Sequence, residues 1–210
     1  GNSGTGLRLM LGLTSGMGLN LSFWGDESLS SRPMSRVIKP LTEMGANIEA
    51  SDGMLPISLS PASFQKQYTY ELPVASAQVK SSILLAGLAA GIGIEIIEPV
   101  QTRDHTERML RHFGANIEIT SKGSKNVIQL SPSNHLQAQD YTVVGDISSA
   151  AFLIVGALIS NSPGLEITNV GMNPSRTGVL EALQKMGANI EIKNQRLESG
   201  EPCADLKVKK

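Results

Sequence analysis

The chain has 210 residues, 40% of them hydrophobic and 18% charged, and its formal net charge is −1. This balance creates no long-range field that would attract nucleic acid or an anionic membrane, so a bound anion would have to be held by local arginine and lysine side chains. The most apolar runs, residues 81–94 and 150–159, are too short and too rich in small residues to span a membrane. The single cysteine, Cys203, excludes an internal disulfide framework. We therefore expect a soluble, globular, cytoplasmic protein.

Three apolar helices, rich in alanine or leucine, are predicted along the chain. They are expected at residues 5–15, 76–90 and 147–159, and each is followed by a short alternating strand, at 19–24, 92–97 and 165–170. Further strands are expected to lead into the second and third helices, at residues 68–73 and 141–144.

The sequence Gly-Ala-Asn-Ile-Glu occurs three times, at residues 45–49, 114–118 and 187–191. Apolar residues at helical spacing precede each copy, so each glycine is predicted to end a helix and each Asn-Ile-Glu to open a strand. A second alternating segment follows each copy across a turn, which predicts a β-hairpin. These second strands are expected at residues 55–59, 127–130 and 206–208.

These patterns describe one folding unit that is repeated in tandem. The unit is β-α-β-α-β-β and about 70 residues long, and its expected product is a mixed α/β fold with helices packed on one side of each sheet. The first copy lacks its leading strand. The chain starts at Gly1, inside a glycine-rich loop, and stops at Lys210, just after a strand pattern. We therefore expect a piece of a longer protein.

Each apolar helix begins with a cluster of small polar residues, at 1–5, 76–78 and 145–149. Helix N-termini present unpaired N–H groups and the positive end of the helix dipole. Each cluster could therefore bind an anion, or it could simply cap its helix.

Basic residues favour an anion near the first two clusters. Arg8 lies about one turn into the first helix, and Arg32 and Arg103 are each predicted to open a further helix. A cation at the start of a helix is unfavourable unless an anion or acid compensates it, so we expect phosphate or carboxylate ligands.

Histidine and cysteine patterns do not favour metal or thiol chemistry. His105, His112 and His135 show no metal-binding spacing, and the first two are better explained as part of a partly exposed helix. Cys203 has no adjacent base, so a buried strand or loop cysteine is the expected explanation. No metal site is predicted.

Six motifs together resemble the 5-enolpyruvylshikimate-3-phosphate synthase family, and they run in family order across essentially the whole chain. They are Gly-Asn-Ser-Gly-Thr-Gly-Leu-Arg (1–8), Gly-Asp-Glu-Ser-Leu-Ser-Ser-Arg-Pro-Met (25–34), Pro-Val-Ala-Ser-Ala-Gln-Val-Lys-Ser (73–81), Arg-Asp-His-Thr-Glu-Arg-Met-Leu (103–110), Gly-Asp-Ile-Ser-Ser-Ala-Ala-Phe (145–152) and Asn-Val-Gly-Met-Asn-Pro-Ser-Arg-Thr-Gly (169–178).

The resemblance implies two domains, each an inside-out α/β barrel of three βαβαββ units with helices central and sheets outside. Residues 1–142 would be two of the three units of the first, substrate-binding domain. Residues 143–210 would be the first unit of the second domain, truncated, with exposed apolar surface or self-association because its partner units are missing.

The resemblance also implies an activity. The intact protein would transfer the enolpyruvyl group from phosphoenolpyruvate to shikimate 3-phosphate, in the pathway to chorismate and the aromatic amino acids. No metal or organic cofactor is expected, nucleic acid and membranes are not expected partners, and the intact protein is expected to be a monomer.

The resemblance also implies which residues contact the substrates, from their positions in the family motifs. The backbone of Gly4 and the guanidinium of Arg32 resemble the phosphoenolpyruvate contacts of the family, and Gln78 resembles the residue that touches both substrates. An arginine offers the bidentate fork that matches a planar carboxylate or a phosphate.

Ser76, Ala77 and Arg103 resemble the shikimate 3-phosphate contacts. Ala77 has no hydroxyl, so only its backbone could contribute. Three further residues resemble positions that shape the glycine-rich loop: Asn2, Thr5 and Arg8.

No catalytic residue is assigned within this chain. The resemblance places the catalytic aspartate and the proton-handling lysine and glutamate of the family after Lys210, and other substrate contacts before Gly1. The fragment alone is therefore expected to be inactive.

Two alternatives remain open at this level. One is the related enolpyruvyl transferase that acts on UDP-N-acetylglucosamine, although it relies on a reactive cysteine in its first domain and Cys203 falls in the second. The other is a non-catalytic anion-binding module in which the polar clusters only cap helices.

Overall fold

The computed structural model describes residues 1–132, 135–160 and 163–209 and divides into two compact units. Unit 1 comprises Gly1–Thr102 and Gly114–Leu136, and unit 2 comprises Arg103–Phe113 and Gln137–Lys210. Lys210, the end of the predicted second-domain segment, lies outside the described residues. The predicted boundary at residues 142–143 concerns domains of a longer protein and stays a prediction.

Unit 1 contains four helices and seven strands among the described residues. In chain order they are α1 (Gly4–Gly16), β1 (Leu21–Phe23), α2 (Glu27–Ser30), α3 (Ser35–Met44), β2 (Asn47–Ser51), β3 (Met54–Ser60), β4 (Gln67–Glu71), α4 (Ala77–Ala90), β5 (Gly93–Glu98), β6 (Ile117–Lys122) and β7 (Lys125–Leu130). The strands form an antiparallel sheet of order β1-β3-β2 and a mixed sheet of order β4-β5-β7-β6, in which β4 and β5 are parallel. The mixed α/β fold predicted from the repeat is confirmed.

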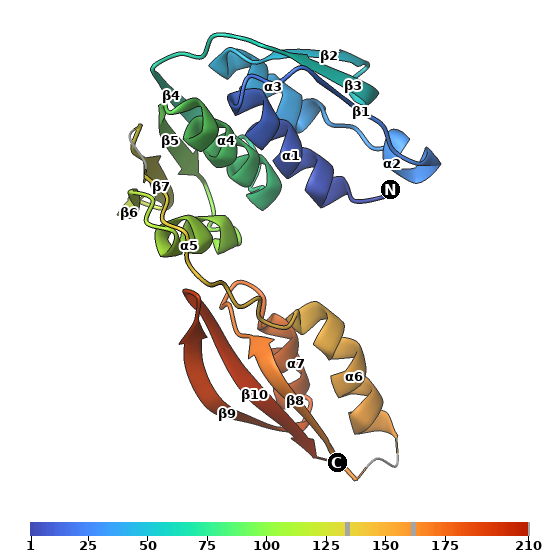
Figure 1. The fold of residues 1–210 in the computed structure, drawn as a ribbon. Coiled ribbons are helices and arrows are strands. Elements are labelled where there is room, and N and C mark those ends of the chain that lie inside the picture. Colours follow the sequence, from blue (N-terminus) through green and yellow to red (C-terminus); the bar gives the residue numbers. More distant parts are fainter. Residues whose placement is uncertain (133–134, 161–162, 210) are drawn as a thin grey trace. The chain divides into compact units, whose positions relative to one another are not determined.

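Helices α1, α3 and α4 pack against one another inside unit 1, with the sheets outside them (Figure 1). Glycines let α1 and α4 approach closely, because a β-carbon at Gly12 or Gly16 would collide with the backbone carbonyl of Ser82 or Ala86. The Ser82 hydroxyl also donates to the Arg8 carbonyl at 2.8 Å. The helix pair is therefore closely packed at the centre of unit 1.

Unit 2 contains three helices and three strands among the described residues. They are α5 (His105–His112), α6 (Ile147–Ile159), β8 (Leu165–Gly171), α7 (Gly178–Lys185), β9 (Asn189–Glu198) and β10 (Glu201–Lys209). The sheet has the order β8-β10-β9, and α6 and α7 cover one of its faces (Figure 1). Its core is formed by side chains such as Ile154, Val170, Leu180, Leu206 and Val208.

The repeated glycines act as predicted. Gly45, Gly114 and Gly187 all have positive φ, at 119°, 87° and 93°. Helices α3, α5 and α7 end one or two residues before them, and strands β2, β6 and β9 begin shortly after. A left-handed residue turns the chain out of the helix, and glycine adopts that conformation without steric cost.

One predicted strand, at residues 141–144, is wrong. Only an isolated parallel bridge joins Gly145 to Val170. The preceding backbone makes other hydrogen bonds, since the Thr142 N–H donates to the Ser199 hydroxyl at 2.8 Å. The Tyr141 ring stacks on Phe113, with centroids 5.7 Å apart. These contacts hold the segment against α5 and the β9–β10 turn in place of a strand ladder.

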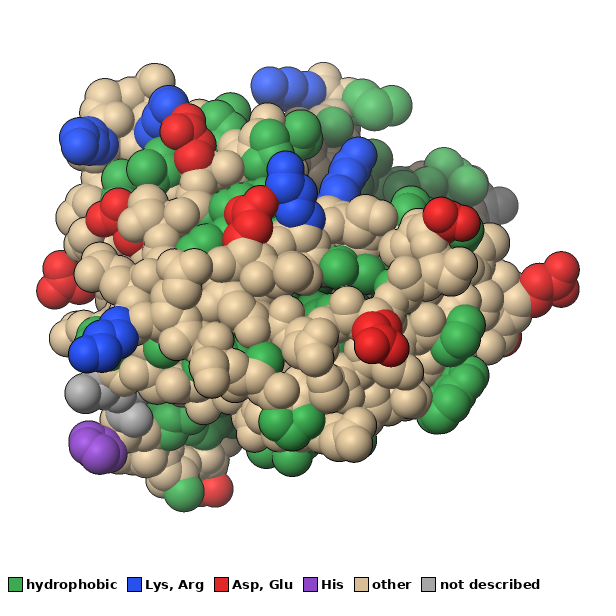
Figure 2. Space-filling model, turned by 90° about the horizontal axis from the view of Figure 1, so that it is seen from above, with side chains coloured by type: hydrophobic (Ala, Val, Ile, Leu, Met, Phe, Trp, Pro, Cys, Tyr) green, Lys and Arg blue, Asp and Glu red, His purple; other side chains and the backbone are tan. Residues whose placement is uncertain are grey.

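The surface shown in Figure 2 carries charges of both signs, scattered among hydrophobic and uncharged polar side chains. This mixture agrees with the formal charge of −1. Within the part of the chain that the structure describes, no helix combines the length and the hydrophobicity needed to cross a bilayer.

Candidate functional site

The N-termini of α1 and α4 are joined in unit 1. Ser3 caps α1 by accepting from the Gly6 N–H at 3.0 Å, and Ser76 caps α4 by accepting from the Val79 N–H at 3.4 Å. The side-chain amide of Gln78 donates to the Thr5 hydroxyl at 2.8 Å and so links the two helix starts. The capping explanation therefore holds for both helices, and two positive dipole ends also lie together.

Two guanidinium groups flank the buried Gly4. A β-carbon built on Gly4 would lie 3.1 Å from Nη1 of Arg8 and 3.2 Å from Nη1 of Arg32. Arg8 donates to the carbonyls of Gly4 and Pro33, each at 3.2 Å, and Arg32 donates to the Ser28 hydroxyl at 3.1 Å. Any side chain at Gly4 would occupy the space between the two cations.

The positive charge at this point is not neutralised by the protein. Neither Arg8 nor Arg32 forms an ion pair with a carboxylate within the described residues. Burial lowers the pKa of the Arg8 guanidinium, and the positive charges of Arg32 and Arg36 lower it further. An anion beside Gly4 would relieve this repulsion and would meet the N–H groups of the helix start.

The predicted position of Arg32 at a helix start is wrong. Helix α3 begins at Ser35, and the Arg32 N–H donates to the Leu29 carbonyl at 3.1 Å, where it closes the short helix α2. Helix α2 is capped by Asp26, whose carboxylate accepts from the Leu29 N–H at 2.8 Å. A helix of a single turn has no apolar periodicity, so the element that positions Arg32 is not predictable from the sequence pattern.

The other residues predicted for the site lie at separate positions in the structure. Ala77 is the first residue of α4, and Asn2 is exposed just before α1. Arg103 belongs to unit 2, where it is exposed and stands two residues before the first residue of α5. Unit 1 therefore brings together Gly4, Arg8 and Arg32 on one side and Thr5 and Gln78 on the other.

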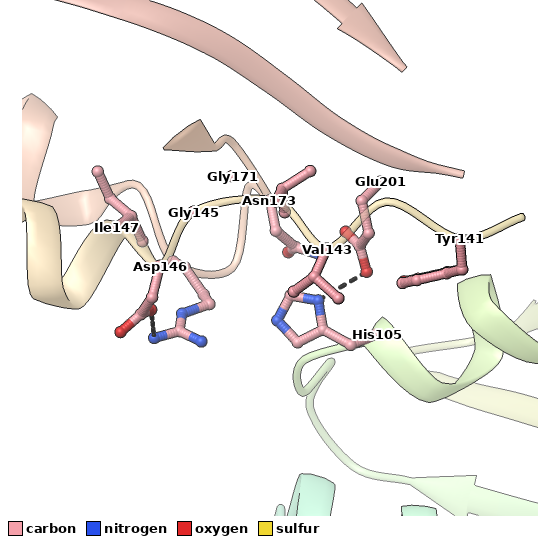
Figure 3. Close-up of a pocket in the computed structure, with 11 residues that line it drawn as sticks. His105, Tyr141, Val143, Gly145, Asp146, Ile147, Gly171, Asn173 and Glu201 are labelled. Carbon is pink, nitrogen blue, oxygen red and sulfur yellow. Dashed lines mark hydrogen bonds and ion pairs between the residues drawn. The ribbon is translucent and has the colours of Figure 1, made fainter. Parts of the chain in front are cut away.

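Unit 2 has a cavity of about 280 Å³ between α5, the start of α6, the end of β8 and the start of β10. Figure 3 shows the His105 imidazole directed at Glu201, with a distance of 2.7 Å between Nδ1 and Oε1. Across the cavity, Arg176 donates to the Asp146 carboxylate at 2.6 Å and to the Ser148 hydroxyl at 2.7 Å. The ionisable side chains that line this cavity are thus paired with one another.

A polar network holds α5 within unit 2. The Asp104 carboxylate accepts from Arg108 Nε at 2.9 Å and from the buried amide of Asn173 at 2.7 Å. Burial alone would raise the pKa of Asp104, but the hydrogen bonds from Arg108 and Asn173 and the charge of Arg108 together hold it below its ordinary value. This network is not predictable from the motifs of the sequence. The four-residue spacing of Asp104 and Arg108 was its only local signal.

The polar cluster at residues 145–149 is a helix cap. Asp146 accepts from the N–H groups of Ser148 and Ser149, each at 3.2 Å, and its charge already pairs with Arg176. This carboxylate occupies the place where an external anion would bind. The candidate anion site is therefore the Gly4 cluster of unit 1, which we define as Gly4, Arg8 and Arg32 with the joined starts of α1 and α4.

Cys203 and the histidines have structural surroundings. Cys203 is buried on β10, as expected, and burial raises the pKa of its thiol. His105 and His112 lie on α5 and are partly exposed, as expected. Within the described ranges, no three or more histidine, cysteine or acidic residues are grouped so that they could hold a metal ion.

The whole chain, residues 1–210, matches the family model described as EPSP synthase (3-phosphoshikimate 1-carboxyvinyltransferase). Among curated relatives, the 3-phosphoshikimate 1-carboxyvinyltransferase of Endomicrobium trichonymphae is 49% identical over 209 residues and that of Parvibaculum lavamentivorans 50% identical over 212 residues. Both matches cover 100% of this chain, and 48% and 47% of the relatives. The chain therefore spans about half the length of the curated relatives it matches.

A solved structure shows the same likeness. The EPSP synthase from Acinetobacter baumannii, solved at 2.37 Å, is 45% identical and superposes with a TM-score of 0.84. The match covers 99% of this chain and 46% of that chain.

Proposed function

The chain belongs to the EPSP synthase family, and we propose that it is part of a longer protein that transfers the enolpyruvyl group from phosphoenolpyruvate to shikimate 3-phosphate. In this reaction the acceptor hydroxyl adds to C2 of phosphoenolpyruvate, the carbon that carries the phosphate, as a proton adds to C3. Loss of phosphate from C2 and of a proton from C3 then restores the double bond. The product leads to chorismate and the aromatic amino acids. The observation that carries the proposal is the unneutralised pair of arginines beside Gly4, within a chain that matches the family along its full length.

Both proposed substrates are polyanions, so the protein has to hold several negative charges close together. Fixed cations and backbone N–H groups perform this task when they are organised before the substrate arrives. Arg32 supplies a guanidinium 3.2 Å from the β-carbon position of Gly4. We assign Gly4, Arg32 and Gln78 to phosphoenolpyruvate.

We assign Ser76, the backbone of Ala77, Gln78 and Arg103 to shikimate 3-phosphate. Ser76 and Ala77 form the N-terminal end of α4, where backbone N–H groups and the helix dipole favour a phosphate. Gln78 is held by its hydrogen bond to Thr5, at the junction of the two helix starts, where it could contact both substrates.

Thr5 and Arg8 are suited to positioning. The Thr5 hydroxyl accepts a hydrogen bond from the Gln78 amide. Arg8 donates hydrogen bonds to the Gly4 carbonyl and to the carbonyl of Pro33, the residue after Arg32. These bonds support the role proposed for both as residues that shape the loop, together with Asn2.

We propose no organic cofactor and no metal for this reaction, because proton movement and charge stabilisation are sufficient for it. We propose a cytoplasmic, monomeric protein. We expect no turnover from residues 1–210 alone, because they span about half the length of the relatives that carry the activity in their names.

The test is calorimetry of the intact protein with each substrate, together with an assay of phosphate release. Arg32→Ala should mainly weaken phosphoenolpyruvate binding and Arg103→Ala mainly shikimate 3-phosphate binding, each by about 1.5–3 kcal/mol, which corresponds to roughly 10- to 150-fold. Lys66→Ala is the matched control, because Lys66 is an exposed cation of unit 1 outside the Gly4 cluster.

Unchanged affinities in both arginine variants would contradict the site assignment. Phosphate release with UDP-N-acetylglucosamine as acceptor, and none with shikimate 3-phosphate, would instead identify the related enolpyruvyl transferase. Binding of neither acceptor would leave a non-catalytic anion-binding module.

A further inference from the structure

Unit 1 contains another cavity, of about 270 Å³, between the first half of α3, the end of β4 and the first turn of α4. Arg8 and Arg32 do not line it, and Ser76 is the one residue assigned to the substrates that does. This α3 cavity therefore shares only the start of α4 with the Gly4 cluster and differs from it in the rest of its lining.

Two cations of α3 line the cavity. Arg36 and Lys39 are three residues apart, which places them on one face of the helix, and both are exposed. Neither is paired with a carboxylate within the described residues. The next acidic group along α3 is Glu43, which accepts from the Tyr68 hydroxyl at 2.8 Å. The positive charge of the cavity is thus available to a ligand.

The rest of the cavity is apolar. Leu72 and Val79 are 2% and 5% exposed and belong to the core. Tyr70 adds a half-buried ring, which stacks on Tyr68 with centroids 5.9 Å apart and an interplanar angle of 18°. Burial raises the pKa of the Tyr70 phenol, and the charge of Glu43 raises it further, so the hydroxyl stays a donor at neutral pH. Val74 stands exposed at the rim.

We propose that the α3 cavity binds a small organic anion, with a phosphate or carboxylate group held by Arg36 and Lys39 and a flat apolar body between Tyr70, Leu72 and Val79. Ligand pockets combine an apolar lining with a few convergent polar groups and typically measure about 300–1,000 Å³, so this cavity suits a compound with a single ring. The attraction between an anionic group and two cations is strongest where the apolar part of the ligand displaces water around them.

The test is calorimetry of the intact protein with phenyl phosphate and with benzoate, after saturating shikimate 3-phosphate and phosphoenolpyruvate have been brought to reaction equilibrium. The proposed substrate site is then filled by substrates or products, and no net reaction heat is released. We expect one binding event per chain. Lys39→Glu should weaken it at least about tenfold, because one attractive charge becomes repulsive. Val74→Trp should weaken it to a similar extent by filling the rim of the cavity without changing the charge.

Lys66→Glu is the matched control, since it makes the same charge change at an exposed lysine of unit 1 that does not line this cavity. Inorganic phosphate should bind much more weakly than phenyl phosphate, because it has no apolar body. The absence of binding to the wild type, equal loss in Lys66→Glu, or unchanged affinity in both cavity variants would overturn the proposal. Circular dichroism of each variant separates loss of binding from loss of folding.

Discussion

Helices α4 and α6 are similar in their apolar composition and different in their surroundings. Both are apolar around most of their circumference, and such helices are normally buried on all sides. In α4 most residues of the first three turns are buried, including the charged Lys80. In α6 four residues are buried, whereas Phe152 and Ile159 are 83% and 80% exposed.

The difference comes from what packs against each helix. Helix α4 meets α1 across close glycine contacts, and α3 covers another side. Among the described residues α6 packs mainly on β8 and β10, and a β-carbon at its Gly156 would meet nothing within 4 Å. The exposed apolar surface predicted for the third repeat is observed. An apolar helix sequence thus predicts that the helix needs a packing partner. Whether its side chains are buried depends on whether that partner is present.

The largest effect is expected for the buried ion pair of α4. Lys80 Nζ lies 3.1 Å from Glu98 Oε2, and both side chains are almost fully enclosed. Lys80→Met should lower the free energy of unfolding of the chain by about 3–5 kcal/mol, because it leaves Glu98 charged and buried. Urea unfolding followed by circular dichroism measures this. The double variant Lys80→Met/Glu98→Gln should recover a large part of the loss, and failure to recover it would show that packing, not charge, dominates at this position.

Glycine substitutions test the helix contacts directly. Gly12→Ala should destabilise unit 1 by about 1–3 kcal/mol, because the new methyl group collides with the Ser82 backbone. Gly156→Ala is the matched change on the open face of α6 and should stabilise unit 2 by about 0.5–1 kcal/mol, since only the helix-propensity gain remains. Amide hydrogen exchange reports the two units separately. Equal destabilisation by both changes would contradict the contrast between α4 and α6.

The stability of unit 2 should depend on pH through the Asp104 carboxylate. The folded-state pKa of Asp104 lies below its ordinary value, so its contribution to stability is full above that value and is lost as the pH falls through the folded-state pKa. Asp104→Asn should cost about 1–2 kcal/mol near neutral pH, through the weakened bonds to Arg108 and Asn173. The difference between the urea midpoints of wild type and variant should narrow as the pH is lowered from about 6 to about 3. A constant difference across this range would exclude the carboxylate charge as the cause.

The smallest effect on stability is expected on the exposed face of α6. Phe152→Ser should change the free energy of unfolding by less than about 0.5 kcal/mol, because the ring is exposed. It should nevertheless reduce self-association of the 210-residue chain, measured by sedimentation velocity, because a large exposed ring favours contact between copies. Val100→Ser is the control, an exposed apolar residue of unit 1 outside α6. Equal reduction in both variants would remove the special role of α6.

Much of the candidate site was predictable from the sequence, although not its geometry. The family motifs pointed to Gly4, Arg32 and Gln78, and the structure places Gly4 with Arg32 and bonds Gln78 to Thr5. The prediction that Arg32 opens a helix is wrong, because Arg32 follows the short helix α2 and α3 starts only at Ser35. The assignment of Arg103 to shikimate 3-phosphate stays a prediction.

The sequence by itself determined the local elements. Each repeated glycine ends a helix because its positive φ is a property of one residue, and alternating apolar residues define the hairpins because the period of a strand is local. Only the tertiary structure decided which polar groups meet. Asn173 reaches Asp104 across 69 positions and Glu201 reaches His105 across 96. The strand expected at residues 141–144 is absent for the same reason, since its backbone and its tyrosine bind distant partners. Such pairings depend on how packed elements approach in space, and no periodicity along the chain records that approach.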